Sequence, residues 1–164
     1  MLLLSATSDE DEREMNEVVV AAAWAAGGVN LAAALWGAWR WWQVEPSRVF
    51  WVLLRAGQAA ALAFALLCGV LVLAGHKPDD GLFWVYVLVP IAVAFVAEQL
   101  RLASAQTVLD ARGLEDASAV GGLPAADQRS VVLQIVRREM GVMALSAAAM
   151  AFLLVRAATT AAGF

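Results

Sequence analysis

Apolar residues in this chain gather in four long blocks separated by shorter polar stretches. The blocks run from about residue 18 to 39, 49 to 75, 82 to 103 and 137 to 158. Each is long enough for a helix that crosses a bilayer, which takes about 20 mostly apolar residues. No stretch alternates with the period of a barrel strand, and helices satisfy their own backbone hydrogen bonds in lipid. The pattern therefore predicts an all-α, polytopic integral membrane protein built as a four-transmembrane-helix bundle.

The polar connections between these blocks are unequal in length. Residues 40–48 and 76–81 are short turns, whereas residues 104–136 form the only long polar segment between two blocks. In that segment the third helix is expected to continue to Gly113, since glycine commonly follows a helix end. Pro124 suits the first position of a new helix, which then runs without a breaker into the fourth block. We therefore expect a cytoplasmic helical hairpin, residues 104–136, between the third and fourth helices.

The N-terminal segment differs in composition from the rest of the chain. Residues 1–17 form an acidic tail ahead of a single transmembrane domain at 18–160, and the tail's SDEDEREMNE holds most of the acidic excess behind the net charge of −4. The tail lacks the charged-then-apolar order of a cleavable signal peptide, so the first helix is expected to remain. Met15 is an alternative start, because MNEVVV leads directly into the first block.

Composition supports lipid as the solvent of this protein. Hydrophobic residues make up 62% of the chain and charged residues 16%, with a mean hydropathy of +0.72. Soluble domains carry about 25% charged residues. The expected partner is thus the lipid bilayer, and the acidic balance argues against a nucleic-acid-binding surface.

Arginine and lysine are distributed unevenly about the four blocks, which predicts the orientation. Cytoplasmic connections of membrane proteins carry the excess of these residues. The segments expected on the outer side of the membrane hold only Arg13, Lys77 and Arg156. The first and third connections with their flanks hold Arg40, Arg48, Arg55, Arg101, Arg112, Arg129, Arg137 and Arg138. Both termini are therefore expected outside the cytoplasm, and the alanine-rich spans suggest a bacterial inner membrane.

Ionisable residues fall in one layer within the predicted spans. If the inner boundary lies near Val49, Arg55 is about 9 Å inside the bilayer, and Glu98 reaches a similar depth from the other direction. An unpaired charge there is costly, so we expect Arg55 to pair with Glu98, with Gln58 and Gln99 completing the hydrogen bonds. The candidate charge layer comprises Arg55, Gln58, Glu98, Gln99, Arg101, Arg138 and Glu139.

A second arrangement of this layer is open. Glu98 and Arg101 are three residues apart on one helix and can pair with each other, while Arg55 can extend its charge to the headgroups. In either arrangement the layer has one of two roles. It fixes which helices are neighbours, or it carries a proton or ion step.

Small residues in the first and second blocks predict close helix packing. Without a hydrophobic force between helices in lipid, close backbone approach supplies the association. The candidate packing residues are Gly27, Gly28, Asn30, Ala56, Gly57, Ala60 and Ala61. Asn30, in mid-membrane, is expected to bond across such a contact.

Tryptophans are concentrated around the first turn. Amphipathic indole rings settle at the membrane–water interface as a belt. The predicted belt consists of Trp36, Trp39, Trp41, Trp42, Trp51 and Trp84.

Candidate chemistry is scarce. Cys68 is the single cysteine, which excludes an intrachain disulfide, and His76 is the single histidine, which excludes bis-histidine haem ligation within the chain. His76 lies beside Asp79 and Asp80, but a solvated HKPDDG turn explains this cluster better than an open metal site. We expect no enzyme activity, no metal and no cofactor.

Two classes of function remain. The first is a non-catalytic assembly, scaffolding or regulatory membrane subunit that meets a protein partner through residues 104–136. The alternative is a small transporter or channel that acts as a homo-oligomer, with Arg55 and Glu98 as its polar step, since four helices hardly enclose a gated wet pathway alone.

Overall fold

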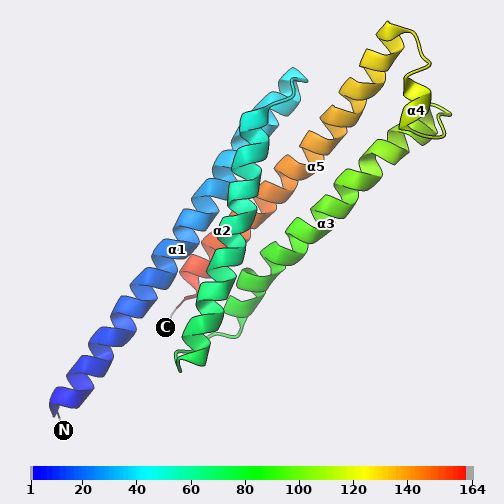
Figure 1. The fold of residues 1–164 in the computed structure, drawn as a ribbon. Helices are drawn as coiled ribbons and strands as arrows, with labels where there is room; N and C mark the ends of the chain where they lie inside the picture. The colour runs from blue at the N-terminus through cyan, green and yellow to red at the C-terminus, as the bar shows by residue number, and fades with distance from the viewer. Residues whose placement is uncertain (1, 162–164) are drawn as a thin grey trace.

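A computed structural model describes residues 2–161, with side chains from residue 13 onward. Within that range every regular element is a helix: α1 Leu2–Gln43, α2 Arg48–Leu73, α3 Leu82–Ala111, α4 Ala117–Val120 and α5 Ala125–Thr159 (Figure 1). Four of the helices, α1, α2, α3 and α5, are long and apolar enough to span a membrane. The all-α prediction and the prediction of four spanning-length helices are thus confirmed.

The helices extend beyond the apolar blocks. Helix α1 begins at Leu2, so the acidic segment that was expected as a tail is the first part of a continuous helix. The α3 helix continues to Ala111, and α5 begins at Ala125, well before the fourth apolar block. The polar segment between the third and fourth blocks is therefore built from the ends of two long helices, joined through the short α4 (Figure 1).

The four long helices alternate in direction, and α5 lies between α1 and α3. The α1–α2 turn and α4 are at one end of the bundle, while the α2–α3 turn is at the other (Figure 1). Helix α5 packs extensively along both α1 and α3, and α2 packs mainly on α1. Helix α2 touches α3 far less than it touches α1. The last helix in the described chain is thus the central one.

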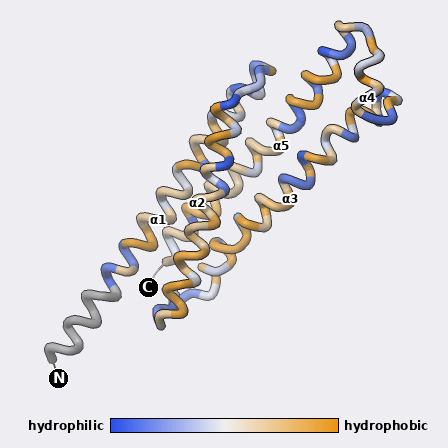
Figure 2. Tube along the Cα trace, viewed as in Figure 1, coloured by the Kyte–Doolittle hydropathy of each residue, from blue (hydrophilic) through white to orange (hydrophobic). Residues whose placement is uncertain are grey.

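Apolar side chains fill both the interior and the outer surface. Val19, Val87, Met143, Met150 and Leu154 are fully buried between the helices. Large apolar side chains also cover the outside, among them Val52, Leu66, Leu88, Phe95, Leu145 and Phe152. Figure 2 shows hydrophobic colours along the middle of the helices and hydrophilic colours toward the end that carries α4. This surface is the one that lipid, rather than water, would solvate.

Two helices end at a glycine in the left-handed region, α2 at Gly75 and α3 at Gly113. Gly113 has a φ of 67°, and its N–H donates to Asp110 while that of Leu114 donates to Leu109. This is the Schellman arrangement, which glycine adopts without a Cβ penalty. The α1–α2 turn uses the same pattern with Val44, whose φ is 55°. A β-branched residue in the left-handed region is strained, so the surrounding contacts must hold it.

Candidate functional site

The charge layer is centred on Glu98 of α3. Nη1 of Arg55, on α2, donates to Oε1 of Glu98 at 2.5 Å, and Nε of Arg101 donates to Oε2 at 3.0 Å. The two ion pairs considered from the sequence, Arg55–Glu98 and Glu98–Arg101, therefore occur together, because one carboxylate serves both guanidinium groups. Arg55 is held in a contact between helices instead of extending alone toward the headgroups.

Gln58 completes this network as expected. Its Nε2 lies 3.3 Å from Oε1 of Glu98, and its Oε1 accepts from Nη1 of Arg55 at 2.7 Å. The spacing of three residues puts Arg55 and Gln58 on one face of α2. Both oxygens of Glu98 consequently have donors.

Three other members of the expected layer stand apart from the network. Gln99 is exposed and makes no hydrogen bond among the described residues, because one residue past Glu98 it points about 100° away around the helix. The expectation for Gln99 was therefore wrong. Arg138 is likewise exposed. Glu139 of α5 interacts electrostatically with Arg101 and Glu98 without a hydrogen bond to either.

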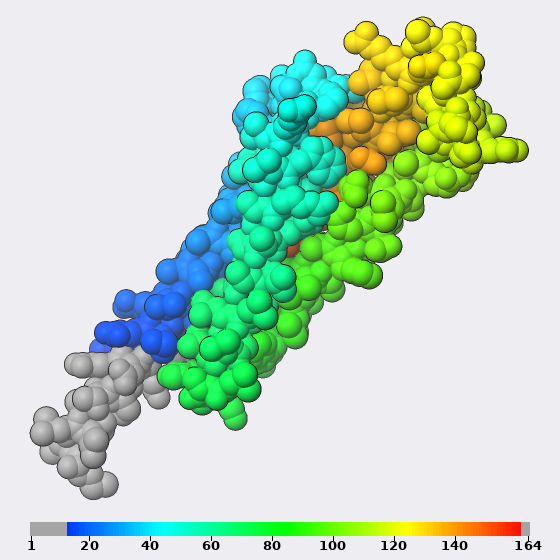
Figure 3. Space-filling view, viewed as in Figure 1, coloured from blue at the N-terminus to red at the C-terminus, as the bar shows by residue number. Residues whose placement is uncertain are grey.

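The network lies at an open edge of the bundle. The side chain of Arg55 is 53% exposed and that of Glu98 is 24% exposed. In Figure 3 the orange atoms of α5 are visible through the space between α2 and α3. A groove of about 280 Å³ between these helices is lined by Gln58, Ala61, Leu62, Ile91, Ala94, Phe95, Glu98 and Met150. The polar groups are therefore at one end of an otherwise apolar groove.

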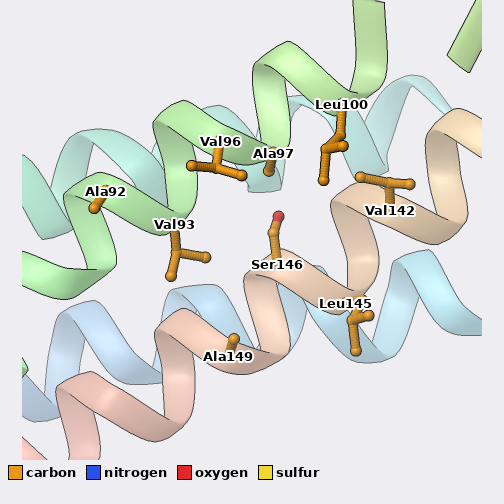
Figure 4. A pocket seen from close by; sticks show the side chains of 9 residues that line it. All are labelled: Ala92, Val93, Val96, Ala97, Leu100, Val142, Leu145, Ser146 and Ala149. Carbon is orange, nitrogen blue, oxygen red and sulfur yellow. The ribbon is translucent and has the colours of Figure 1, made fainter. Parts of the chain in front are cut away.

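A larger groove between α3 and α5 offers a contrast. It has about 430 Å³, and its lining side chains are apolar except for Ser146 (Figure 4). The Ser146 hydroxyl donates to the backbone oxygen of Met143 in its own helix at 2.8 Å. No charged side chain lines this groove. Charge thus distinguishes the α2–α3 groove from its neighbour.

A second polar contact within the spans joins α1 to α2. Asn30 is fully buried, and its Nδ2 donates to the backbone oxygens of Ala26 at 2.9 Å and of Gly57 at 3.0 Å. A Cβ on Gly57 would lie 2.7 Å from Oδ1 of Asn30. Only glycine therefore leaves room for this amide, and the bond that Asn30 was expected to make across the helices is present.

The other small residues divide by the direction in which they face. Gly27 is buried, and a Cβ there would lie 3.2 Å from Val155 of α5. Ala61 is buried and Ala60 is half-buried against the core. Gly28 and Ala56 are exposed and lie one residue off the buried stripe, so within the described chain they face away from the other helices. The close packing expected of these two positions is therefore not made within the described chain.

Tryptophans predicted as one belt have two environments. Trp39, Trp42 and other large apolar residues are exposed, as interface rings would be. Trp36 instead donates to the Ser47 hydroxyl at 3.0 Å, while that hydroxyl accepts from the N–H of Phe50 at the start of α2. This contact supports the strained α1–α2 turn.

Trp41 and Trp51 carry cation–π contacts that sequence reasoning missed. The guanidinium of Arg101 lies 5.8 Å from the Trp51 ring, and that of Arg137 lies 5.3 Å from the Trp41 ring. Trp84, at the other end, packs edge-on against Phe83. Arg–Trp spacing across different helices has no signature in a single sequence, so only the fold reveals these pairs.

The hairpin at 104–136 contains a small core of its own. Val108, Leu109 and Val131 are buried together, with Leu114, Val120, Leu123 and Ile135 packed against them. Arg112 joins its two long helices by donating to Ser130 and Gln134, each at 3.1 Å. In Figure 1 the hairpin extends past the α1–α2 turn. Its core residues therefore contact one another beyond the α1–α2 turn, while Val136 at its base packs against the core of the bundle.

Helix α4 within the hairpin begins with an aspartate cap. Oδ1 of Asp116 accepts from the Ser118 hydroxyl at 2.5 Å and from the N–H groups of Ser118 and Ala119 at 2.8 and 3.0 Å. The Ser118 hydroxyl, more than the backbone N–H groups, lowers the pKa of Asp116 below its ordinary value. The carboxylate form is thus the one that caps the helix.

The turn around His76 has a capping role. Oδ1 of Asp80 accepts from the N–H of Leu82 at 2.8 Å where α3 begins. Nδ1 of His76 is buried and has no hydrogen-bond partner. Among the described residues no group of three His, Cys, Asp or Glu side chains is arranged to hold a metal ion.

No family model, curated protein or solved structure matches this chain.

Proposed function

We propose that this protein is a non-catalytic, multi-pass subunit of a bacterial inner membrane that assembles, scaffolds or regulates a protein partner. The four spanning-length helices form its membrane domain, with both termini outside the cytoplasm and the hairpin inside. The hairpin is the element that meets the partner.

The observation that carries this proposal is the self-contained core of the hairpin. Because Val108, Leu109 and Val131 pack against each other, the hairpin keeps its shape without support from α1 or α2. The recorded side-chain hydrogen bonds of residues 105–134 also stay within α3, α4, α5 and their connections. A rigid projection with exposed charges of both signs suits recognition of a protein by its polar outer surface.

The charge layer has a structural role in this proposal. Oε1 of Glu98 accepts from Arg55 and Gln58, and Oε2 accepts from Arg101. A carboxylate whose two oxygens already accept hydrogen bonds from neighbouring side chains is better suited to holding helices together than to relaying protons. The pair joins α2 to α3 where direct packing between them is sparse.

Native mass spectrometry of the protein released gently from its own membrane tests this proposal. The full chain is expected to carry a second subunit, which is lost when residues 113–123 are replaced by a short Gly-Ser linker. Neutralising the hairpin surface with Asp127→Asn and Arg129→Gln should weaken the complex, whereas Lys77→Gln and Asp79→Asn at the other end should not. A partner that survives removal of the hairpin tip contradicts the proposal, as does a bare monomer.

The competing proposal is a small transporter or channel that acts as an oligomer. The observation that favours it is the groove beside Glu98 and Gln58. In proteoliposomes, Glu98→Gln would then abolish flux while leaving the fold intact. A homo-oligomer with Glu98-dependent flux would replace the subunit proposal.

A further inference from the structure

The α2–α3 groove has the features of a site for one anionic phospholipid. Gln58 and Glu98 line its end nearer the α1–α2 turn and α4, and Arg55 and Arg101 hold Glu98 from beside that end without lining the groove themselves. Its apolar walls run toward the middle of the helices. Ile91 lies seven residues before Glu98, which makes the apolar part about 10 Å long at 1.5 Å per residue. A phospholipid has the same order, with a phosphate at the interface and an acyl chain toward the bilayer centre.

The guanidinium groups at the charged end retain unused donors. Arg55 contacts Glu98 and Gln58 through Nη1, and Arg101 contacts Glu98 through Nε. The other guanidinium nitrogens of both residues have no acceptor among the described side chains. Arginine can offer two parallel N–H groups to a phosphate, so a headgroup could be bound without breaking the contacts to Glu98.

Charge at this end favours an anion. Two guanidinium groups share the single carboxylate of Glu98, and the half-exposed Arg55 leaves positive charge at the surface. Around this end of the bundle the sequence has six arginines, Arg40, Arg48, Arg55, Arg101, Arg137 and Arg138, against three acids, Glu45, Glu98 and Glu139. Basic pockets between helices on the cytoplasmic side are typical sites for anionic headgroups.

We propose that Arg55 and Arg101 bind the phosphate of an anionic phospholipid whose acyl chain lies in the α2–α3 groove. This inference rests on the proposed membrane insertion. The lipid fills the space where α2 and α3 pack poorly, so it completes the contact that the Arg55–Glu98 pair begins. Free phosphate shares the headgroup chemistry but has nothing to place in the groove.

Lipid retention measured by native mass spectrometry tests the site. The full chain is exchanged into mixed micelles with equal phosphatidylglycerol and phosphatidylcholine, whose headgroups differ in net charge. We expect one phosphatidylglycerol to be retained in preference, and Arg55→Gln with Arg101→Gln to reduce that preference about tenfold. Arg55→Lys with Arg101→Lys should keep much of it, and Arg129→Gln in the hairpin should keep all of it.

The groove is tested separately from the charges. Ala94→Leu narrows the α2–α3 groove and is expected to lower retention of the lipid without altering the Arg55–Glu98 pair. Ala92→Leu, two residues away on the same helix, enters the uncharged α3–α5 groove and serves as the control. Thermal unfolding in phosphatidylcholine alone shows which variants are folded.

Several results would overturn the lipid site. Equal retention of both lipids, an unchanged preference in the double Gln variant, or an unchanged retention in a folded Ala94→Leu variant each contradicts it. If inorganic phosphate raises the thermal stability of the protein as much as phosphatidylglycerol does, Arg55 and Arg101 bind a soluble anion instead. A chain found outside the membrane fraction would defeat the proposed membrane subunit itself, whereas a membrane-bound chain with no lipid preference defeats only this site.

Discussion

Helix α2 makes two polar contacts within one turn, on opposite sides of the helix, and they differ in character. On one side Gly57 receives a neutral, fully buried amide from Asn30 across a tightly packed interface with α1. On the other side Arg55 and Gln58 reach Glu98 across an open groove to α3. A short neutral side chain fits where two backbones touch, whereas long charged side chains connect helices that stay apart.

The two contacts therefore depend on different properties of their side chains. The α1–α2 contact depends on shape, because the amide occupies the space that a Cβ on Gly57 would need. The α2–α3 contact depends on charge, and part of that charge remains accessible from outside. Substitutions that change size should therefore act on the first contact, and substitutions that change charge should act on the second.

The largest effect is expected from filling the tight contact. Gly57→Leu puts a side chain where Asn30 lies and should destabilise the protein by about 3 kcal/mol, in the range for overpacked interiors. Gly69→Leu on the same helix is the matched control, since a Cβ there meets no atom within 4 Å. Reversible unfolding in lipid–detergent mixtures measures both. Equal costs for the two variants would show that α1 and α2 are not closely packed at Gly57.

A smaller effect is expected from removing the amide itself. Asn30→Ala loses the hydrogen bond to Gly57 and leaves a small cavity, which should cost about 2 kcal/mol. The cost should not change with ionic strength, because the lost bond is neutral. The same unfolding assay at low and high salt tests this. A strong dependence on salt would mean that Asn30 acts through charged neighbours.

Substitutions in the Arg55–Glu98 pair should lower the free energy of unfolding by less, and their effects should be coupled. Because Arg55 is half-exposed, the Arg55–Glu98 coupling is expected near 1 kcal/mol in a double-mutant cycle of Arg55→Gln and Glu98→Gln. Glu98→Gln should cost more than Arg55→Gln, since Glu98 serves donors from three residues. Additive single effects would show that the pair contributes nothing to stability.

The smallest effect is expected in the hairpin, where water competes for the polar groups. The lowered pKa of Asp116 means that its cap is fully present above the ordinary value of 3.8 and is lost as the pH falls through the lowered value. Hydrogen exchange at Ser118 and Ala119 should therefore accelerate only in strong acid. Asp116→Asn should remove the pH dependence while keeping part of the cap. Protection that is unchanged down to the lowest pH would contradict the capping role.

The position of a residue along its helix axis was predicted most accurately. Counting residues inward from the helix ends placed Arg55 and Glu98 at one depth, because every helical residue rises by the same amount. Counting does not give the direction around the helix. Gln99 and Gly28 were therefore assigned to contacts from which they point away.

Contacts that involve α5 were out of reach for sequence reasoning. A Cβ on Gly37 would clash with Phe50 and crowd Ala144, and one on Gly141 would lie 2.9 Å from Nε1 of Trp41. The contacts of Gly37 with Ala144 and of Gly141 with Trp41 depend on α5 packing along α1, which hydropathy alone does not indicate, whereas the contact of Gly37 with Phe50 joins α1 to α2. The self-contained hairpin core likewise became evident only when Val108 and Val131 were placed side by side.

The central place of α5 has a consequence for biosynthesis. During translation α1 and α2 are made before α5 and can meet through Asn30 and Gly57, but the helix that both α1 and α3 pack against follows all three of them. Until then, buried residues such as Val19 and Ala23 have no α5 to cover them. A chain stalled before α5 therefore presents the quality-control machinery of the cell with three long helices that lack their shared packing partner.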